Sequence, residues 1–153
     1  MADIARAAGV GKGTVFRRFG DRTTQVQEVL RPRVTALREA VTSGPPPLGP
    51  GAAPSPALHA YLDALFDFVW ACRLLIRALE HRAPHADYAN DPSRFWIAEL
   101  TRRLTAARPG TDAEYLAHAV FTALRADVID YLAAEKHMAK ERIRAGLHTL
   151  AGP

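Results

Sequence analysis

Residues 2–19 read ADIARAAGVGKGTVFRRF, and this stretch predicts two short helices joined by a tight turn. The first helix is expected over Ala2–Ala8 and the second over Lys12–Phe19, and a glycine follows each of them. Gly9 suits the turn because a left-handed backbone conformation costs glycine nothing. The apolar residues have the spacing that packs two such helices together: Ile4, Ala8, Val10, Val15 and Phe19.

The second helix has a polar side that suits nucleic acid. Lys12, Thr14, Arg17 and Arg18 fall on the side opposite its apolar residues. In a major groove, arginine forks onto guanine, while lysine and threonine hold phosphates. Residues 1–38 contain eight Arg or Lys against three Asp or Glu, whereas the rest of the chain is nearly neutral. This concentration of positive charge indicates double-stranded DNA as a partner, although a solvated basic face would have the same charge.

The run from Ile4 to Phe19, continued by Gly20, Asp21 and Arg22, resembles the signature of the TetR family of transcriptional regulators. The resemblance covers roughly the first thirty residues. Phe16 stands where the family usually has tyrosine, so it lacks a hydroxyl for a phosphate contact and suits packing better. The resemblance implies these DNA-binding residues: Lys12, Gly13, Thr14, Phe16, Arg17, Arg18 and Arg22.

Members of this family have a further helix before the matched segment, and that helix supplies part of the core of the DNA-binding unit. We therefore expect residues 1–22 to be a helix-turn-helix segment that is incomplete at its N-terminus, through an upstream start or a shortened chain. Without the additional helix, Ile4, Val15 and Phe19 would lack apolar partners. The alternative is a helical ligand-binding dimer that has lost DNA binding.

Residues 23–153 are predicted to be a helical effector-binding and dimerisation domain, which makes the whole chain all-α. Alternation of apolar and polar residues with period two is almost absent. Residues 43–56 contain six prolines and three glycines, so they must connect two helices. Pro32 should bend the helix that contains it or remove one hydrogen bond from it. Helices are expected over Thr23–Thr42, Ser55–Ala83 with a break near Cys72, Pro92–Ala107 capped by Asp91, Thr111–Ala134 capped by Thr111 or Asp112, and Ala139–Leu150.

The resemblance implies that the body binds a small-molecule effector and that the helix Thr23–Thr42 transmits the binding to the DNA-reading helices. Repression, relieved by the effector, is the commoner behaviour in the family. Aromatic residues at helical spacing are candidates for an effector pocket, although ordinary core packing produces the same spacing. The pocket candidates are Tyr61, Leu65, Phe66, Trp70, Phe95, Trp96, Phe121 and Arg125. Arg73, Arg77 or Arg125 would hold an acidic group of the ligand or pair with Asp67, Glu80 or Asp127.

The last two helices are expected to form the interface of a homodimer. Their apolar stripes look too extensive to face only their own chain, although packing inside one chain is the alternative. The interface candidates are Leu116, Val120, Leu124, Val128, Ile143 and Leu147.

Other functional classes find little support in the sequence. There is no nucleophile with a plausible base, no phosphate loop and no zinc-binding pattern, so we expect neither an enzyme nor a cofactor. His81 and His85 are four residues apart and near Asp87, but Pro84 breaks a helix between them, so no metal site is expected. The single cysteine, Cys72, excludes an internal disulfide and suits a small buried residue.

The sequence also gives expectations about location. It contains no apolar run long enough to span a membrane and no secretory signal pattern, so we expect a cytoplasmic protein with no membrane partner. Its richness in alanine, arginine and proline is typical of a GC-rich bacterial source.

Overall fold

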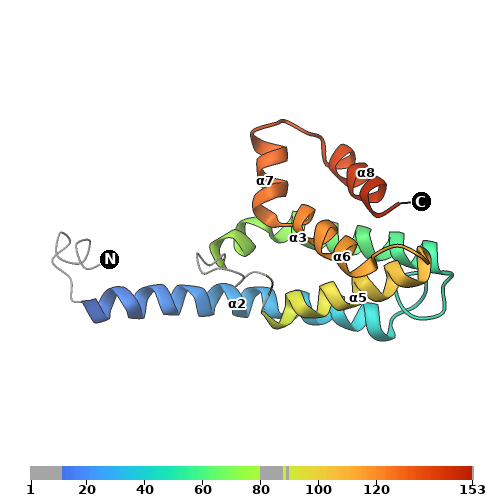
Figure 1. The fold of residues 1–153 in the computed structure, drawn as a ribbon. Helices are drawn as coiled ribbons and strands as arrows, with labels where there is room; N and C mark the ends of the chain where they lie inside the picture. Colours follow the sequence, from blue (N-terminus) through green and yellow to red (C-terminus); the bar gives the residue numbers. More distant parts are fainter. Residues whose placement is uncertain (1–11, 80–87, 89, 153) are drawn as a thin grey trace.

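The computed structural model describes residues 12–79, 88 and 90–152, with side chains from residue 24 onward. The described residues form helices and no strand (Figure 1), which confirms the predicted all-α class. No described helix is both long and apolar enough to cross a membrane. The helices are α2 (Lys12–Ser43), α3 (Pro54–Leu79), α5 (Asp91–Ala107), α6 (Ala113–Ala123), α7 (Ala126–Ala134) and α8 (Lys140–Ala151).

Helix α2 is longer than the sequence predicted. It runs for 32 residues and joins the expected segments Lys12–Phe19 and Thr23–Thr42 into one helix. The predicted break at Gly20 is therefore wrong. A glycine inside a helix costs only about 1 kcal/mol relative to alanine, so helical segments on both sides can continue through it. Pro32 also lies inside α2 without ending it.

The proline-rich connection is confirmed, because no helix covers residues 44–53 and α3 begins at Pro54. Helix α3 then continues unbroken to Leu79, so the break predicted near Cys72 is wrong. Cys72 is 1% exposed, and its Sγ accepts a hydrogen bond from Arg33 of α2 at 3.3 Å. The prediction of a small buried residue at this position is confirmed.

Side chains cap the next two helices. The cap of α5 is Asn90 rather than the predicted Asp91: its side chain accepts a hydrogen bond from the backbone of Ser93 at 2.9 Å. Asp112 caps α6 by accepting from the backbone of Tyr115 at 3.0 Å. Each cap satisfies a backbone N–H that has no partner within its helix.

The single helix predicted over Thr111–Ala134 is divided into α6 and α7, so that prediction is wrong. Arg125 lies between them with φ −57° and ψ 141°, outside the helical region. Its guanidinium donates to both carboxylate oxygens of Asp127, at 2.9 and 3.1 Å. Residues two apart do not face each other on a continuous helix, so this pair fits only the broken one. Helix α8 follows as predicted, shifted by one residue at each end.

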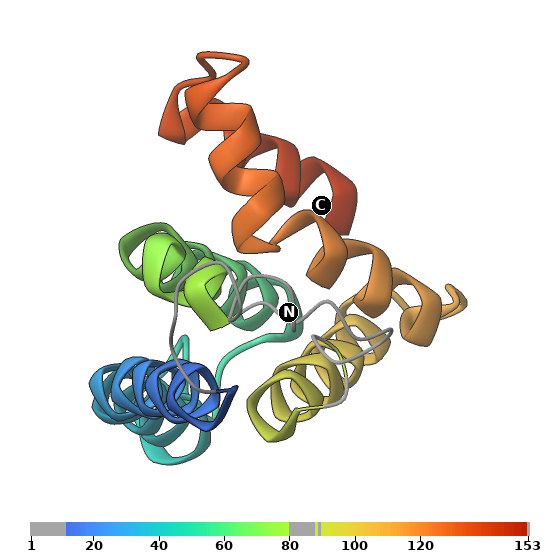
Figure 2. The ribbon, with the colours of Figure 1, turned by 90° about the vertical axis from the view of Figure 1, so that its left-hand side faces the viewer.

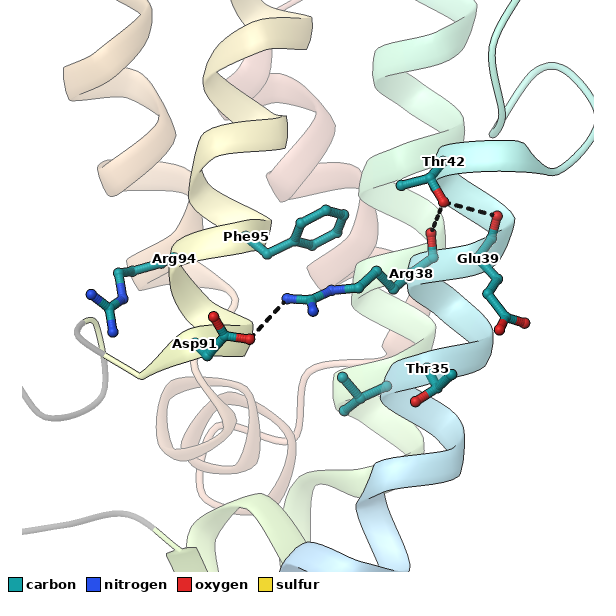
Figure 3. A pocket seen from close by; sticks show the side chains of 8 residues that line it. Thr35, Arg38, Glu39, Thr42, Asp91, Arg94 and Phe95 are labelled. Atoms are coloured by element: carbon teal, nitrogen blue, oxygen red, sulfur yellow. Dashed lines mark hydrogen bonds and ion pairs between the residues drawn. The ribbon is translucent and has the colours of Figure 1, made fainter.

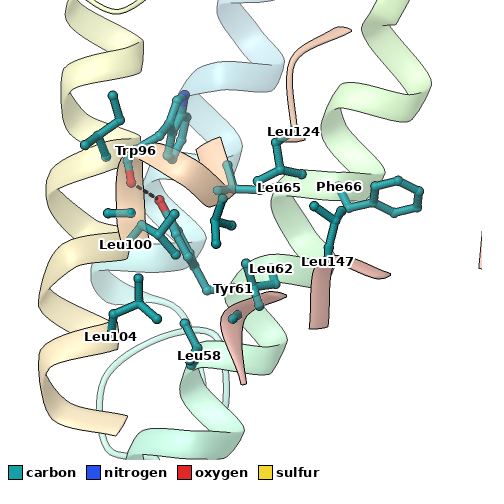
Figure 4. Packing of buried hydrophobic residues seen from close by; sticks show 14 of the residues in the cluster. Leu58, Tyr61, Leu62, Leu65, Phe66, Trp96, Leu100, Leu104, Leu124 and Leu147 are labelled. Carbon is teal, nitrogen blue, oxygen red and sulfur yellow. Dashed lines mark hydrogen bonds between the residues drawn. The ribbon is translucent and has the colours of Figure 1, made fainter. Parts of the chain in front are cut away.

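Helix α3 packs against α2, α5, α7 and α8, and Figure 2 shows it between α2 and the C-terminal helices. Its apolar side meets residues of α5, α6 and α8 in one core (Figure 4). The Tyr61 hydroxyl, which is buried in this core, donates to the backbone carbonyl of Trp96 at 2.9 Å. The most buried large side chains are Leu58, Tyr61, Leu62, Phe66, Leu100, Leu104, Val120 and Ile129.

Charged pairs also hold α8 against α3. Lys140 and Arg144 each lie 2.7 Å from a carboxylate oxygen of Asp67. His148 lies 2.9 Å from Asp63. These pairs flank the buried apolar side of α8, so the last helix is fixed to the body by both kinds of contact.

Candidate DNA-contacting helix and ligand groove

The predicted DNA-binding residues all lie in the N-terminal part of α2. Lys12, Gly13, Thr14, Phe16, Arg17, Arg18 and Arg22 are on its backbone between its first residue and its eleventh. Thr14, Arg17 and Arg18 occupy positions i, i+3 and i+4, which fall on one side of a helix. The turn that precedes this segment lies outside the described residues.

This part of α2 extends beyond the helical body (Figure 1). Among the described side chains of α2, the first that is buried is Leu30, at 6% exposed. Val34, Leu37 and Val41 follow on the same side and pack against the core. Because α2 is one helix, its basic N-terminal turns are continuous with the turns that pack on α3.

The eight residues predicted to line an effector pocket differ in how deeply the structure buries them. Four of them are core residues at most 4% exposed: Tyr61, Leu65, Phe66 and Trp96. Burial raises the pKa of the Tyr61 hydroxyl, which stays protonated as a donor to Trp96. The other four are partly buried: Trp70, Phe95, Phe121 and Arg125.

A groove lies between α2 and the first turns of α5 (Figure 3). Arg38 of α2 points across it, with its guanidinium carbon 4.3 Å from the centre of the Phe95 ring. Its Nη2 donates to Asp91 at 3.3 Å, while its Nε is shielded from solvent and has no hydrogen-bond partner. Phe95 is the only predicted pocket residue in this lining. The groove is lined by Val34, Thr35, Arg38, Glu39, Thr42, Asp91, Arg94 and Phe95.

The three arginines considered as anchors for a ligand all have protein partners. Arg73 and Arg77 of α3 both pair with Asp130 of α7, and the Arg73 Nε lies 3.5 Å from a carboxylate oxygen. Arg125 pairs with Asp127, which was the predicted alternative to holding an acidic group of a ligand. Burial raises the pKa of Asp127, but the hydrogen bonds and charge of Arg125 outweigh this and leave the pKa lowered.

The residues predicted for the dimer interface divide into two groups. Val120, Leu124, Ile143 and Leu147 are at most 6% exposed within a single chain. For these four, the alternative of packing inside one chain describes the structure. Leu116 and Val128 are partly buried. The large exposed apolar side chains of α6, α7 and α8 are Tyr115, Tyr131 and Leu150.

Metal ligands do not cluster in the described part of the chain, where no group of three His, Cys, Asp or Glu side chains could hold an ion. His81, His85 and Asp87 lie outside the described residues.

Sequence reasoning missed the groove residues Arg38 and Asp91. They are 53 residues apart, and no local pattern pairs them. They face each other across the groove only because α2 and α5 both pack against α3.

The family model for bacterial regulatory proteins of the tetR family matches residues 1–29. No curated protein and no solved structure matches the chain. The matched segment contains all seven predicted DNA-binding residues.

Proposed function

We propose that the chain is a transcriptional regulator of the TetR type that binds a double-stranded DNA operator as a homodimer, and the match of the tetR-family model to residues 1–29 supports this proposal. It acts as a repressor that leaves the operator when a small-molecule effector binds to the helical body. The observation that carries this proposal is the family match over residues 1–29, which coincides with the concentration of positive charge at this end of the chain.

The course of α2 supports a direct mechanical link between DNA and body. Leu30 is the first buried side chain of α2 among those that the structure describes, and the 18 helical residues that precede it, from Lys12 to Val29, span about 27 Å. A small rotation of the body-packed part of α2 would displace Arg17 and Arg18 by a larger distance. Two recognition helices in a dimer must match the helical repeat of DNA, so such a displacement weakens binding.

The dimer would form through exposed apolar residues of the last three helices. Tyr115 is 72% exposed, Tyr131 is 50% exposed and Leu150 is 40% exposed. Large aromatic and aliphatic side chains in contact with water are typical of surfaces that another protein covers.

The test is binding of the purified chain to DNA from around its own gene, with scrambled DNA as reference, across a salt series. We expect selective binding whose affinity falls steeply with salt, because lysine and arginine displace counterions from phosphates. Arg17→Ala should weaken selective binding by about 10- to 100-fold. Arg142→Ala, which removes an exposed arginine of α8, is the control and should bind like the original chain.

A second candidate, a helical ligand-binding dimer without DNA binding, draws on the unbroken course of α2 through Gly20. This second candidate would be favoured if the chain forms a folded dimer that does not prefer DNA from around its own gene over scrambled DNA. Equal affinity of the Arg17→Ala variant and the original chain for the selected DNA would contradict the assignment of Arg17 to the reading side.

A further inference from the structure

We propose that the groove between α2 and α5, rather than the aromatic core, is the effector site, and that it takes a small aromatic carboxylate. The proposal rests on the regulatory function above and adds to it the place and chemical class of the ligand. It is carried by three residues, Arg38, Asp91 and Phe95, and by the contacts among them.

The guanidinium of Arg38 is poorly satisfied where it stands. Its hydrogen bond to Asp91 is 3.3 Å long, whereas charge-assisted pairs of this kind are usually about 2.7–2.9 Å. Its Nε makes no hydrogen bond although solvent does not reach it. Nε and Nη2 lie along one edge of the guanidinium, and their spacing lets them donate to the two oxygens of one carboxylate. A ligand carboxylate at this edge would accept a hydrogen bond from Nε, which has no partner when Nη2 donates to Asp91.

Asp91 is a weak competitor for this position. Its side chain is 82% exposed, and that of Arg38 is 37% exposed, so water screens their attraction. When a ligand takes Arg38, the released Asp91 carboxylate stays in water at little cost. Arg94, also in the groove lining, is exposed, and its guanidinium points away from Arg38 (Figure 3).

The apolar residues of the lining determine which group the ligand has beside its carboxylate. The guanidinium carbon of Arg38 lies 4.3 Å from the centre of the Phe95 ring, and Val34 lines the groove from the facing helix. A flat aromatic group beside these two residues would bury apolar surface while its carboxylate meets Arg38. A cationic ligand fits less well, because the group without a hydrogen-bond partner is Arg38 Nε, which is a donor and needs an acceptor.

The position of the groove connects ligand binding to α2. In the described part of the chain, the polar and ring contacts recorded between α2 and α5 both come from Arg38. Moving Arg38 from Asp91 to a ligand therefore breaks one of these two side-chain contacts between the helices. The helix that changes its partner is the same one that contains Arg17 and Arg18.

The test uses 1-naphthoate as probe and 1-naphthamide as its neutral counterpart, with binding to the purified full chain measured by calorimetry. We expect saturable binding of the naphthoate and at least ~10-fold weaker binding of the amide, since only the anion fills both donors of Arg38. Arg38→Gln should weaken naphthoate binding by ~10-fold or more. Arg31→Gln is the matched control, because Arg31 is an exposed arginine seven residues earlier on α2, paired with Glu28, and should bind unchanged.

Asp91→Asn supplies a readout that a nonspecific anion site would not give. Removing the competing carboxylate should tighten naphthoate binding by ~3-fold or more, while Asn90 still caps α5. Circular dichroism and urea unfolding check that each variant is folded. The proposal is overturned by absence of saturable naphthoate binding up to ~10 mM, or by equal affinity of Arg38→Gln and the original chain.

This failure can be told from failure of the regulatory function. Selective DNA binding without naphthoate binding would overturn the groove proposal and leave the regulator standing. Naphthoate binding through Arg38 without any selective DNA binding would support the site and contradict the regulator.

Discussion

Arg103 is the charged side chain with the least exposure in the described part of the chain, at 3%. Its guanidinium donates to Glu99 at 2.8 Å and to the backbone carbonyls of Ala57 and Leu48 at 2.7 and 2.6 Å. It also lies over the Tyr61 ring at 4.8 Å. One side chain of α5 thus fixes the start of α3 and the proline-rich connection before it.

Replacing Arg103 tests this role. Arg103→Met should lower the free energy of unfolding by about 2–4 kcal/mol, because it leaves two carbonyls and part of a carboxylate without their donor. Arg102→Met is the control: Arg102 binds the same Glu99 but is 65% exposed, and its loss should cost less than about 1 kcal/mol. Urea unfolding measures both, and equal effects of the two substitutions would contradict a special role for Arg103.

Glu99 should make stability depend on pH. Burial raises the pKa of this carboxyl, but hydrogen bonds from Arg102 and Arg103 outweigh burial and leave it below its ordinary value of 4.5. A pKa lowered by folding stabilises the protein above the unfolded-state value, and this contribution is lost as pH falls through the folded-state value. We therefore expect the stability that Glu99 contributes to disappear in acid below about pH 4.5.

The measurement is urea unfolding over a series of pH values for the original chain and for Glu99→Gln. The variant should be less stable at neutral pH, and the difference between the two should shrink as the solution becomes acid. Glu135→Gln, which alters an exposed carboxylate at the end of α7, should follow the original chain throughout. A constant difference between Glu99→Gln and the original chain would show that ionisation of Glu99 is irrelevant.

At the scale of the elements, α2 is the helix on which the proposed mechanism depends. It contains a glycine and a proline in its interior, both poor helix formers, yet it runs unbroken for 32 residues. Its C-terminal half is stabilised by packing, through Leu30, Val34 and Val41. Helices in proteins owe most of their stability to such packing rather than to propensity.

Gly20→Ala tests the helical course of α2. An alanine in a helix is about 0.5–1 kcal/mol more favourable than a glycine, so amide hydrogen exchange around residue 20 should slow by about 2- to 5-fold. Gly146→Ala is a matched comparison, since Gly146 lies inside α8 and an added Cβ there would meet nothing within 4 Å. Faster exchange in Gly20→Ala, with stabilisation in Gly146→Ala, would indicate a turn at Gly20.

At the scale of the whole molecule, the buried core already uses most of the apolar residues that the last helices offer. The large apolar side chains that these helices leave exposed are Tyr115, Tyr131 and Leu150. Lys136 lies 5.5 Å from the Tyr131 ring, so this aromatic residue is beside a positive charge as well as exposed.

Tyr131→Glu should therefore shift the proposed homodimer towards monomer by about 10-fold or more in dissociation constant, because it places a charge in an apolar interface. Analytical ultracentrifugation measures the shift. Leu74→Glu is the control, because Leu74 is 69% exposed on α3 rather than on the last helices. Dissociation by Leu74→Glu alone would place the interface on α3.

Sequence reasoning predicted local features well wherever neighbouring residues were enough. The connection at residues 44–53, the cap on α6 and the course of α8 each follow from prolines, a capping carboxylate or apolar spacing within a few residues. It failed at the break between α6 and α7, where Arg125 and Asp127 form a pair without any glycine or proline.

The sequence by itself determined the all-α class, the resemblance of the N-terminal segment to the tetR family and the position of the basic residues along α2, because these depend on neighbours along the chain. Only the tertiary structure decided that Tyr61 and Trp96 fill the core and that Arg38 meets Asp91 across a groove. An aromatic residue at helical spacing suits a core and a pocket equally. Which of the two it lines depends on how completely other helices cover it, and that depends on residues far away in the chain.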